Sequence, residues 1–366
     1  VDLFESRAAS RETILRATLA RTADTWRPEA GAEIAWNSLD SRSTSTTFSA
    51  SPKRSTAATQ VSEFRSEVFA TVDWRPAQRW AVTAGVAYEM SRLHAQGAND
   101  HQRRFGFLKP RLTVSYKPDA RSDLRLSLRR SVGQLSFGDF VASANLAEGK
   151  ESEGNVDLGP DHRTRLALDF DHRFGRRGAF NLGLFHDWRG DVLEAAVLPT
   201  GAFAMTNVRS ARAWGGSANL ELPLDRFAPG GWLTLSYSRQ ASRVADPLSG
   251  RRRALNGSRP ETSSVAFRQD LGTMKLSWGV EYAASFHTNS WYADEVRSLR
   301  HAQDLGAYVE TTRFAGAKLR LQLDGLTGTR NTYDRALYAG GRTGGSPQRE
   351  VWDILTPLSV TASISR

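Results

Sequence analysis

The sequence predicts an all-β fold, a transmembrane antiparallel β-barrel, on the basis of three observations. Long stretches alternate apolar and polar side chains with a period of two, as strands between two environments do; within residues 123–129 the leucines alternate with Arg and Ser. Many stretches exceed the roughly 5–6 residues of a soluble strand and reach the roughly 9–11 residues that cross a bilayer. Tight turns alternate with long polar loops, which is the asymmetry of bacterial outer-membrane barrels.

Trp or Phe residues flank the tight turns. An amphipathic ring rests at the boundary between lipid headgroups and acyl chains, so rings gathered at one level of a β-structure indicate a membrane interface. The turns with this feature lie within 25–28, 74–80, 174–180, 227–232 and 314–317.

The alternation divides the chain into roughly fifteen strands, and no stretch has the period of a helix. The strands are expected near 5–22, 28–44, 61–75, 79–94, 105–117, 121–136, 161–174, 179–196, 206–223, 230–246, 259–271, 273–289, 296–314, 317–338 and 349–366. The tight connections fall near 23–27, 76–78, 118–120, 175–178, 224–229, 272 and 315–316. The long connections, rich in Ser, Gly, Asn and charge as solvated loops are, fall at 45–60, 95–104, 137–160, 197–205, 247–258, 290–295 and 339–348.

The composition fits a barrel and excludes other classes. Hydrophobic residues make up 40% of the 366 residues, and the mean hydropathy is −0.46. No apolar stretch approaches the roughly 18–20 residues of a membrane helix. A barrel strand shows lipid only every second side chain, so a polar average is expected. The chain contains no cysteine, which excludes disulfides and thiolate sites.

The net charge of +10 comes from 49 Lys and Arg residues against 39 Asp and Glu residues. These basic residues are spread along strands, with acidic residues among them, and form no single basic face. We therefore predict no nucleic-acid partner. A lipopolysaccharide-rich surface or an anionic ligand would suit the excess equally well.

The count of strands and the N-terminal sequence both predict a partial barrel. Residues 1–7 contain neither the charged region nor the apolar region that a signal peptide has. If the protein is exported, the given chain is therefore expected to begin after processing or inside a longer precursor. An odd number of strands would start at the long-loop side and end at the periplasmic side, whereas complete single-chain bacterial barrels have an even number. Lipid does not tolerate open sheet edges, so missing strands are expected from another polypeptide piece.

Two phrases of the chain resemble TonB-dependent outer-membrane receptors. The first runs from residues 135–140 through a long loop to 154–161, which is similar to the family's "GNPxLKPE" element with Val156, Gly159 and Asp161 as departures. The second is 318–326 followed by 333–338, similar to the penultimate strand of these receptors, with Gly325 where the family often has Asn. The last strand ends in Arg366, where family members typically end in Phe.

The resemblance implies that residues 1–366 form the C-terminal portion of such a barrel, about 15 strands of a 22-stranded barrel, with the plug domain and first strands absent from this chain. It implies a location in the bacterial outer membrane and active transport of a scarce ligand: a ferric siderophore or similar chelate, cobalamin or an oligosaccharide. The partners implied are the TonB machinery, acting through a plug, a companion N-terminal fragment with the plug and remaining strands, and outer-membrane lipid and lipopolysaccharide. Any bound metal would belong to the ligand, so we expect no cofactor.

Two alternatives from other classes stay open at this point: a passive porin, and a structural or surface-adhesion barrel. An enzyme is not expected, because the chain has no GxSxG, no HExxH and no phosphate-binding glycine loop. His94, His101, His287 and His301 lie in pairs near two loops without metal-ligand spacing, so no metal site is predicted.

Two groups of residues are candidates for function. The inward positions of the alternation would line the lumen and contact a plug, or they are polar only because they face water: Arg125, Arg129, Arg163, Arg165, Asp169, Asp171, Glu281, Lys318, Arg320 and Asp324. Extracellular loop residues would bind ligand, or they form only a solvated surface: Phe137, Asp139, Phe140, Asn145, Arg251, Arg252 and Arg253. In the family the loop matching 137–160 and its successor, 197–205, can close over a ligand.

Overall fold

The computed structural model describes residues 2–23, 25–47, 53–96, 101–134, 143–145, 150–152, 155, 157–197, 203–314 and 316–365. In this part of the chain the regular structure is β-strand apart from one 3₁₀ turn, η2 Gly272–Met274. None of its helical segments is long and apolar enough to span a membrane. The strands are β1 Asp2–Ala20, β2 Trp26–Thr47, β3 Lys53–Ala77, β4 Trp80–Gln96, β5 His101–Tyr116, β6 Ser122–Val132, β7 Ser143–Asn145, β8 Lys150–Ser152, β9 His162–Phe174, β10 Gly178–Val197, β11 Phe203–Pro223, β12 Gly231–Ala245, β13 Arg252–Arg253, β14 Glu261–Leu271, β15 Leu276–Ala283, β16 Phe286–Trp291, β17 Glu295–His301, β18 Asp304–Phe314, β19 Ala317–Asp324, β20 Arg330–Leu337, β21 Gln348–Leu355 and β22 Ser359–Ser365.

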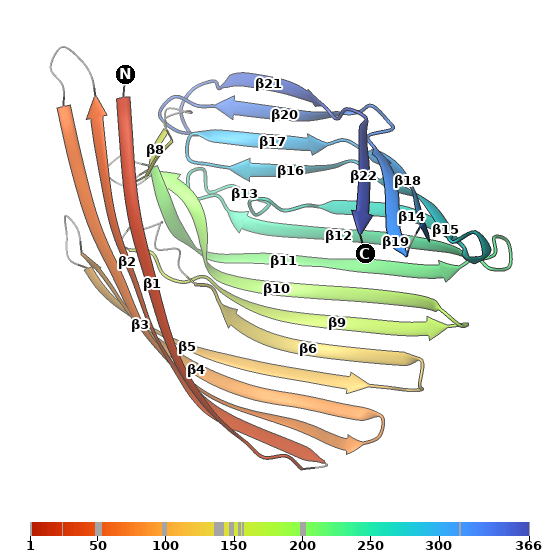
Figure 1. The fold of residues 1–366 in the computed structure, drawn as a ribbon. Helices are drawn as coiled ribbons and strands as arrows, with labels where there is room; N and C mark the ends of the chain where they lie inside the picture. Colours follow the sequence, from red (N-terminus) through yellow and green to blue (C-terminus); the bar gives the residue numbers. More distant parts are fainter. Residues whose placement is uncertain are drawn as a thin grey trace.

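One large antiparallel sheet curves through the molecule (Figure 1). Its strands follow in the order β1-β2-β3-β4-β5-β6-β9-β10-β11-β12-β14-β15-β18-β19-β22, with β13 paired to β12. Neighbouring strands follow each other along the chain and are antiparallel, as in an up-and-down barrel wall, although β7 and β8, β13, β16 and β17, and β20 and β21 lie in the chain between later neighbours. The all-β, antiparallel fold that the alternation predicts is therefore confirmed. The path of the described sheet ends at β1 and β22, which do not pair with each other.

The last four predicted strands each divide into two. Their upper halves form a separate antiparallel sheet in the order β16-β17-β20-β21 (Figure 1). The hydrogen-bonded ladders of the four strands are all interrupted at the same level of the sheet. The residues without strand structure there are 284–285, 302–303, 325–329 and 356–358. Gly325 contributes to the break, because its φ is +75° and a Cβ there would lie 2.5 Å from the carbonyl oxygen of Pro357. Only glycine adopts this conformation without strain.

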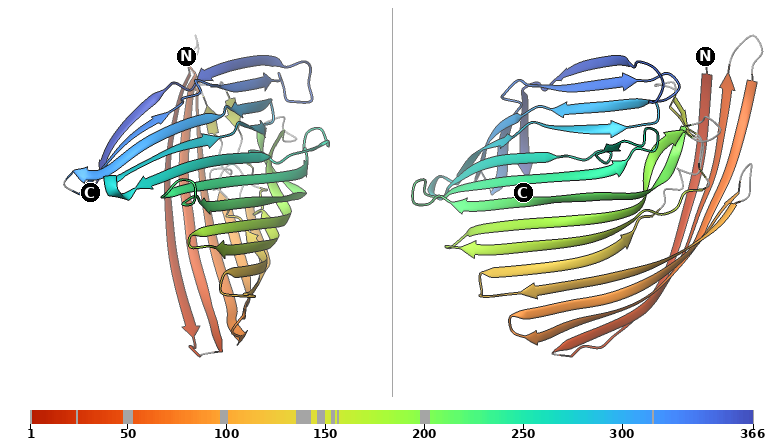
Figure 2. Two further views of the ribbon diagram at one scale, coloured as in Figure 1. Left: turned by 90° about the vertical axis from the view of Figure 1, so that its right-hand side faces the viewer. Right: turned by 180° about the vertical axis from the view of Figure 1, so that it is seen from behind.

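The two ends of the sheet differ, but less than predicted (Figure 2). The connections 133–161, 246–260 and 338–347 are long, whereas the predicted long loops 45–60, 95–104, 197–205 and 290–295 are largely replaced by strand, because β2 to β5, β10, β11, β16 and β17 extend into them. The turn between β9 and β10 is only a few residues long and uses Gly175 with a φ of +57°. Asp2 at the start of β1 pairs with Thr47 at the end that carries the long connections, whereas Ser365 at the end of β22 pairs with Lys318 at the end that carries the short turns. The chain therefore enters the sheet at the long-loop end and leaves it at the short-turn end.

The outer face of the sheet carries an apolar band bounded by aromatic rings. On β2, Trp26 and Trp36 share this face and pair with Trp74 and Phe64 on β3. Ten residues of strand span about 33 Å, which at a barrel tilt of about 40° corresponds to a height of about 25 Å, the height of the apolar band of outer-membrane barrels. The outer positions between the two tryptophans, such as Ile34, are all apolar. The spacing of the rings therefore fits the two interfaces of a bilayer.

Candidate functional site

The ten predicted lumen residues lie on one face of the sheet, the inner face, opposite the apolar band. In register, Arg125 faces Asp169 across β6 and β9, while Leu124 and Leu166 point the other way and are exposed. Leu321 is likewise exposed on the outer face, beside Arg320 on the inner one. Exposed leucines in long rows beside a polar face are what a lipid-facing wall requires.

Asp187 on β10 is the centre of one inner cluster. Its carboxylate is almost fully buried and accepts two hydrogen bonds of 2.7 Å from Arg165, in the fork geometry that makes such pairs strong. Arg163 lies 4.0 Å away, and the guanidinium of Arg165 also stacks 4.4 Å over the ring of Phe185. The structure thus brings two predicted residues together on an acidic residue that the sequence reading missed.

Glu310 on β18 is the centre of a second inner cluster, nearer the short-turn end. Arg268 Nη2 lies 2.8 Å, Lys318 Nζ 3.0 Å and Arg320 Nη1 3.5 Å from its carboxylate. Arg320 also lies 3.8 Å over the ring of Tyr308. Lys318 and Arg320 were predicted, whereas Arg268 and Glu310 were not. Their inward positions in the alternation, with Glu310 directly opposite Arg320, were the signal that could have found them.

The remaining predicted residues are less tightly held. Asp171 accepts a hydrogen bond of 2.7 Å from Asn181, and Asp324 accepts one of 2.8 Å from Gln322. Arg125 lies 3.8 Å from Asp123 on its own strand and is half exposed. For Arg129, Asp169 and Glu281, no ion pair is found within the described residues.

A loop segment folds back onto the inner face at the long-loop end. It comprises the described residues 155 and 157–161 of the GNVDLGPD stretch, of which Leu158 is fully buried and packs in a cluster with Val61, Leu93 and Ala95. Asn207 on β11 holds its backbone, because its amide donates to the carbonyl oxygen of Gly159 at 2.8 Å and its Oδ1 accepts from the N–H of Gly159 at 2.7 Å.

The same segment is fixed at both ends. Asn155 donates to the carbonyl oxygen of Met205 at 2.8 Å, and Arg189 pairs with Asp161 at 2.6 Å. Arg103 donates to the carbonyl oxygen of Asp157. The segment is therefore an anchored part of the inner wall and not a free surface loop.

The β10–β11 hairpin reverses its faces near its tip. Even-numbered positions are the exposed ones at Leu182, Leu184 and Trp188, whereas even-numbered positions are buried from Gly190 to Ala196. The change occurs around Asp191, which has a φ of +52°. Because of this reversal, Glu194 points inward and is almost completely buried.

Glu194 and Asp246 form a buried ion-pair network with two arginines from different loops. Arg253 donates to Glu194 and to Asp246, each at 2.7 Å, and Arg342 donates to Asp246 at 2.7 Å. Asn256 adds a hydrogen bond of 3.1 Å to Glu194. The network joins β10 to the β12–β14 and β20–β21 connections at the long-loop end of the wall.

The pKa of Asp246 reflects this network. Burial alone would raise the pKa of the carboxyl, but the hydrogen bonds from Arg253 and Arg342, with those from the backbone N–H groups of Ser249 and Leu248, lower it from 3.8 to about 2. Asp246 is therefore ionised at any physiological pH, and the network is held by permanent charges.

The predicted ligand residues are separated by the structure. Arg251 is exposed, Arg252 is exposed on the outer face, and Arg253 is buried in the Glu194–Asp246 network. Asn145 belongs to β7 and pairs with Lys150 on β8. Phe137, Asp139 and Phe140 lie outside the described residues. Within the described residues, no group of three or more His, Asp or Glu side chains could hold a metal ion.

Comparisons with known proteins give one family and a consistent fold. A family model described as "TonB dependent receptor-like, beta-barrel" matches residues 6–353. No curated protein sequence matches the chain significantly.

Among solved structures, the chain is similar to the ferric citrate transporter FecA in its unliganded form, with a TM-score of 0.70 and 12% identity over 98% of this chain and 54% of that one. It is similar to the copper transporter OprC, with a TM-score of 0.69 and 13% identity over 98% of this chain and 58% of that one. The siderophore receptor PiuA from Acinetobacter baumannii gives a TM-score of 0.66 and 10% identity, covering 98% and 56%. The chain therefore spans little more than half the length of these proteins.

Proposed function

The chain belongs to the family of TonB-dependent receptor β-barrels, and from this premise we propose that it forms the C-terminal part of the wall of an active transporter. Members of the family reside in the bacterial outer membrane, and so does this protein. The transport would use a plug inside the barrel, which the TonB machinery pulls with energy from the inner-membrane proton gradient.

The observation that carries the proposal is the two-faced wall, with leucines on one side and clustered charges on the other. In a transporter the inner clusters around Asp187 and Glu310, with Arg165, Lys318 and Arg320, would face the plug. The carboxylates of Asp187 and Glu310 are buried, but their basic partners Arg165 and Lys318 are 39% and 46% exposed. We expect these basic side chains to exchange partners with groups of the plug when it moves. The other predicted lumen residues would take part in the same exchange.

We infer that the cargo is an anionic metal chelate. The exposed basic residues Arg251 and Arg252 at the long-loop end favour an anion, and the similar solved structures are described as transporters or receptors of copper, ferric citrate and siderophores. The loop residues Phe137, Asp139 and Phe140, with Asn145, would contact the chelate from the β6–β9 connection. Cobalamin and oligosaccharides are the competing cargo classes.

A companion piece is part of the proposal. The backbone groups along the outer edges of β1 and β22 have no neighbouring strand within the described sheet, and hydrocarbon offers them no hydrogen bonds. Further strands would therefore pair with both edges and close the wall. The plug and its contact with the TonB machinery would belong to the same companion piece.

Uptake of radiolabelled ferric citrate and of a ferric catecholate by whole cells tests the proposal. Cells with the intact gene should accumulate label only when TonB is functional and the proton gradient is present, and deletion of the gene should abolish the accumulation of the chelate that is its cargo. Uptake of either chelate through this protein that continues after TonB is removed would instead identify a passive porin. The absence of gene-dependent uptake of both chelates, with TonB-dependent uptake of cobalamin, would reassign the cargo.

A further inference from the structure

The outer face of the wall holds a pair of arginines directly opposite each other. Arg212 on β11 and Arg243 on β12 are cross-strand partners in register, and both are exposed. Arg212 also pairs with Trp188 on β10, so the two arginines share the outer face with the exposed Trp188 and Leu184. Like charges directly opposite on antiparallel strands are destabilising unless something neutralises them.

A third arginine joins this pair around a hollow of about 660 Å³. Arg252 on β13 faces Ala245, two residues beyond Arg243 on the same side of β12. The described lining of the hollow contains three arginines with Trp214, His186 and Ser210 among the other residues, and no acidic residue. No carboxylate forms an ion pair with these three arginines within the described residues. The hollow therefore has the charge and the donors to receive an anion.

The level of these three arginines along the strands indicates which kind of anion they would bind. Trp188 lies beside Arg212 at the same level, and one outer position below come His186 and Trp214. The rings of His186 and Trp214 stack with centroids 6.2 Å apart, and the ring of His186 is tilted against that of Trp188 with centroids 4.4 Å apart. Below these rings come Leu182 and Leu184, of which Leu184 is 60% exposed. Aromatic rings mark the headgroup boundary above an apolar band, so the arginines lie at the level of the lipid headgroups of the outer leaflet.

We propose that Arg212, Arg243 and Arg252 bind the phosphate groups of a lipopolysaccharide molecule whose acyl chains lie along the leucines below. Guanidinium forks match phosphate oxygens in bidentate geometry, and one bridging phosphate would turn the repulsion between Arg212 and Arg243 into two attractions. The inference rests on the outer-membrane location of the protein and not on its transport activity.

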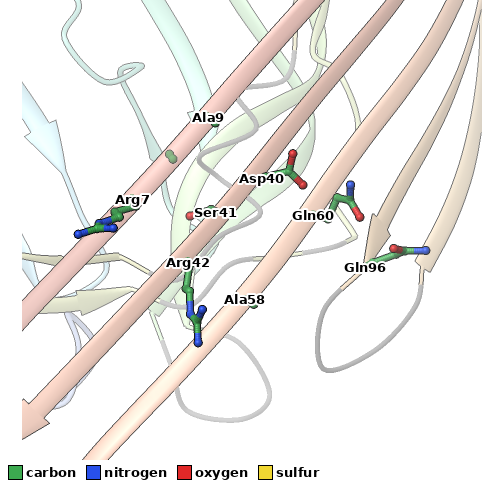
Figure 3. Close-up of a pocket in the computed structure, with 9 residues that line it drawn as sticks. Arg7, Ala9, Asp40, Ser41, Arg42, Ala58, Gln60 and Gln96 are labelled. Carbon is green, nitrogen blue, oxygen red and sulfur yellow. The ribbon is translucent and has the colours of Figure 1, made fainter.

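Two further opposed pairs lie on the same face toward the long-loop end. Arg92 and Arg104 are partners across β4 and β5, one outer position above Met90. Arg7 and Arg42 are partners across β1 and β2, beside a second hollow that also includes Asp40 (Figure 3). Figure 3 shows the guanidinium of Arg42 pointing away from that carboxylate. These pairs repeat the arrangement, but only the Arg212 site combines three arginines with an acid-free lining.

The test is binding of purified lipopolysaccharide to the full-length protein, measured by native mass spectrometry. The double variant Arg212→Gln/Arg243→Gln should bind lipopolysaccharide about tenfold to thirtyfold more weakly, given the usual contribution of each basic residue near an anionic membrane surface. Lipopolysaccharide from which the phosphates have been removed should bind wild type and variant equally, and excess inorganic phosphate should not displace the intact lipid. The matched control is Arg176→Gln/Arg177→Gln, which removes two exposed arginines from the short turn at the other end.

A second measurement separates the proposal from a folding defect. In detergent free of lipopolysaccharide the double variant should unfold at the same temperature as wild type or higher, because it no longer opposes two like charges. Equal binding by wild type and double variant, an equal loss in the control, displacement by inorganic phosphate, or earlier unfolding of the double variant would each overturn the proposal.

Discussion

The two faces of the wall use arginine in opposite ways. On the inner face arginines meet carboxylates, as Arg165 meets Asp187 and Arg268 meets Glu310. On the outer face, toward the long-loop end, arginines meet each other, as Arg212 meets Arg243. Arg111 and Arg129 do face each other on the inner side. Their cross-strand row, however, continues through Arg165 on β9 to its partner Asp187 on β10.

This difference explains how a net charge of +10 is tolerated in one sheet. Several inner charges are compensated within the protein, as those of Arg165 and Arg268 are by Asp187 and Glu310. Within the described residues Arg212 and Arg243 on the outer face have no ion pair, so we expect their charge to be compensated by the surroundings. The number of arginines in a sequence is therefore less informative than the face on which each one lies.

The largest expected effect is on the free energy of unfolding, and it differs between two consecutive arginines that lie on opposite faces. Arg253→Ala should lower the free energy of unfolding by about 3–5 kcal/mol, because it leaves Glu194 and Asp246 buried with fewer partners. Arg252→Ala, the matched control, should change it by about 0.5 kcal/mol or less, since Arg252 is exposed. Urea unfolding in lipid vesicles, followed by tryptophan fluorescence, measures both. Similar losses for the two variants would contradict the assignment of the faces.

The second effect tests whether the outer face meets lipid. Leu184→Arg should cost about 2–4 kcal/mol in vesicles, because the side chain lies in the apolar band although it is 60% exposed. Gln240→Arg, on the inner face of the neighbouring β12, serves as the control and should be nearly neutral, because an added charge there stays in water. A tolerated Leu184→Arg would mean that this face is wetted.

The third effect depends on pH and concerns the inner network. The pKa of Asp246 is lowered from 3.8 to about 2, so its ionised form stabilises the folded protein fully above about pH 4. This contribution, about 2 kcal/mol, is lost as the pH falls from about 4 to 2. Unfolding free energies measured across this range should fall more steeply for wild type than for Asp246→Asn. Parallel curves would show that the carboxyl is not held by Arg253 and Arg342.

The smallest effect has the opposite sign and belongs to the outer face. Arg104→Gln removes one member of the pair with Arg92, and in detergent free of lipopolysaccharide it should raise the free energy of unfolding by about 0.2–1 kcal/mol. Adding lipopolysaccharide should abolish this gain. A loss of stability in detergent would show that the two arginines do not repel each other.

Much of the wall could be predicted from the sequence, because alternation records the environment of each face. The strands and the inward positions of Arg165 and Arg320 follow from a period of two. Alternation also sends Arg252 and Arg253 to opposite faces, although a run of three arginines looks like a single basic patch.

Other features depended on contacts between distant residues. Glu194 meets Arg253 across 59 positions and Arg342 meets Asp246 across 96 positions, and nothing local in the sequence records those partners. The reversal at Asp191 was also hidden, because it requires a positive φ in a residue that is not glycine. The break in the last four strands was missed because the alternation was followed across it, while Gly325 and Pro357, each within one of the breaks, were local signs of it.

The gap between the wall and the β16-β17-β20-β21 sheet has a mechanical consequence. Continuous ladders pass a displacement of one strand to its neighbours along their full length, whereas an interrupted ladder confines it to one side. The four strands β16, β17, β20 and β21 are instead tied to the wall by side chains, through the Arg342–Asp246 ion pair and the hydrogen bonds between Asn256 and Trp291. A displacement of this small sheet would therefore reach the wall at these few contacts and not along the whole length of a strand.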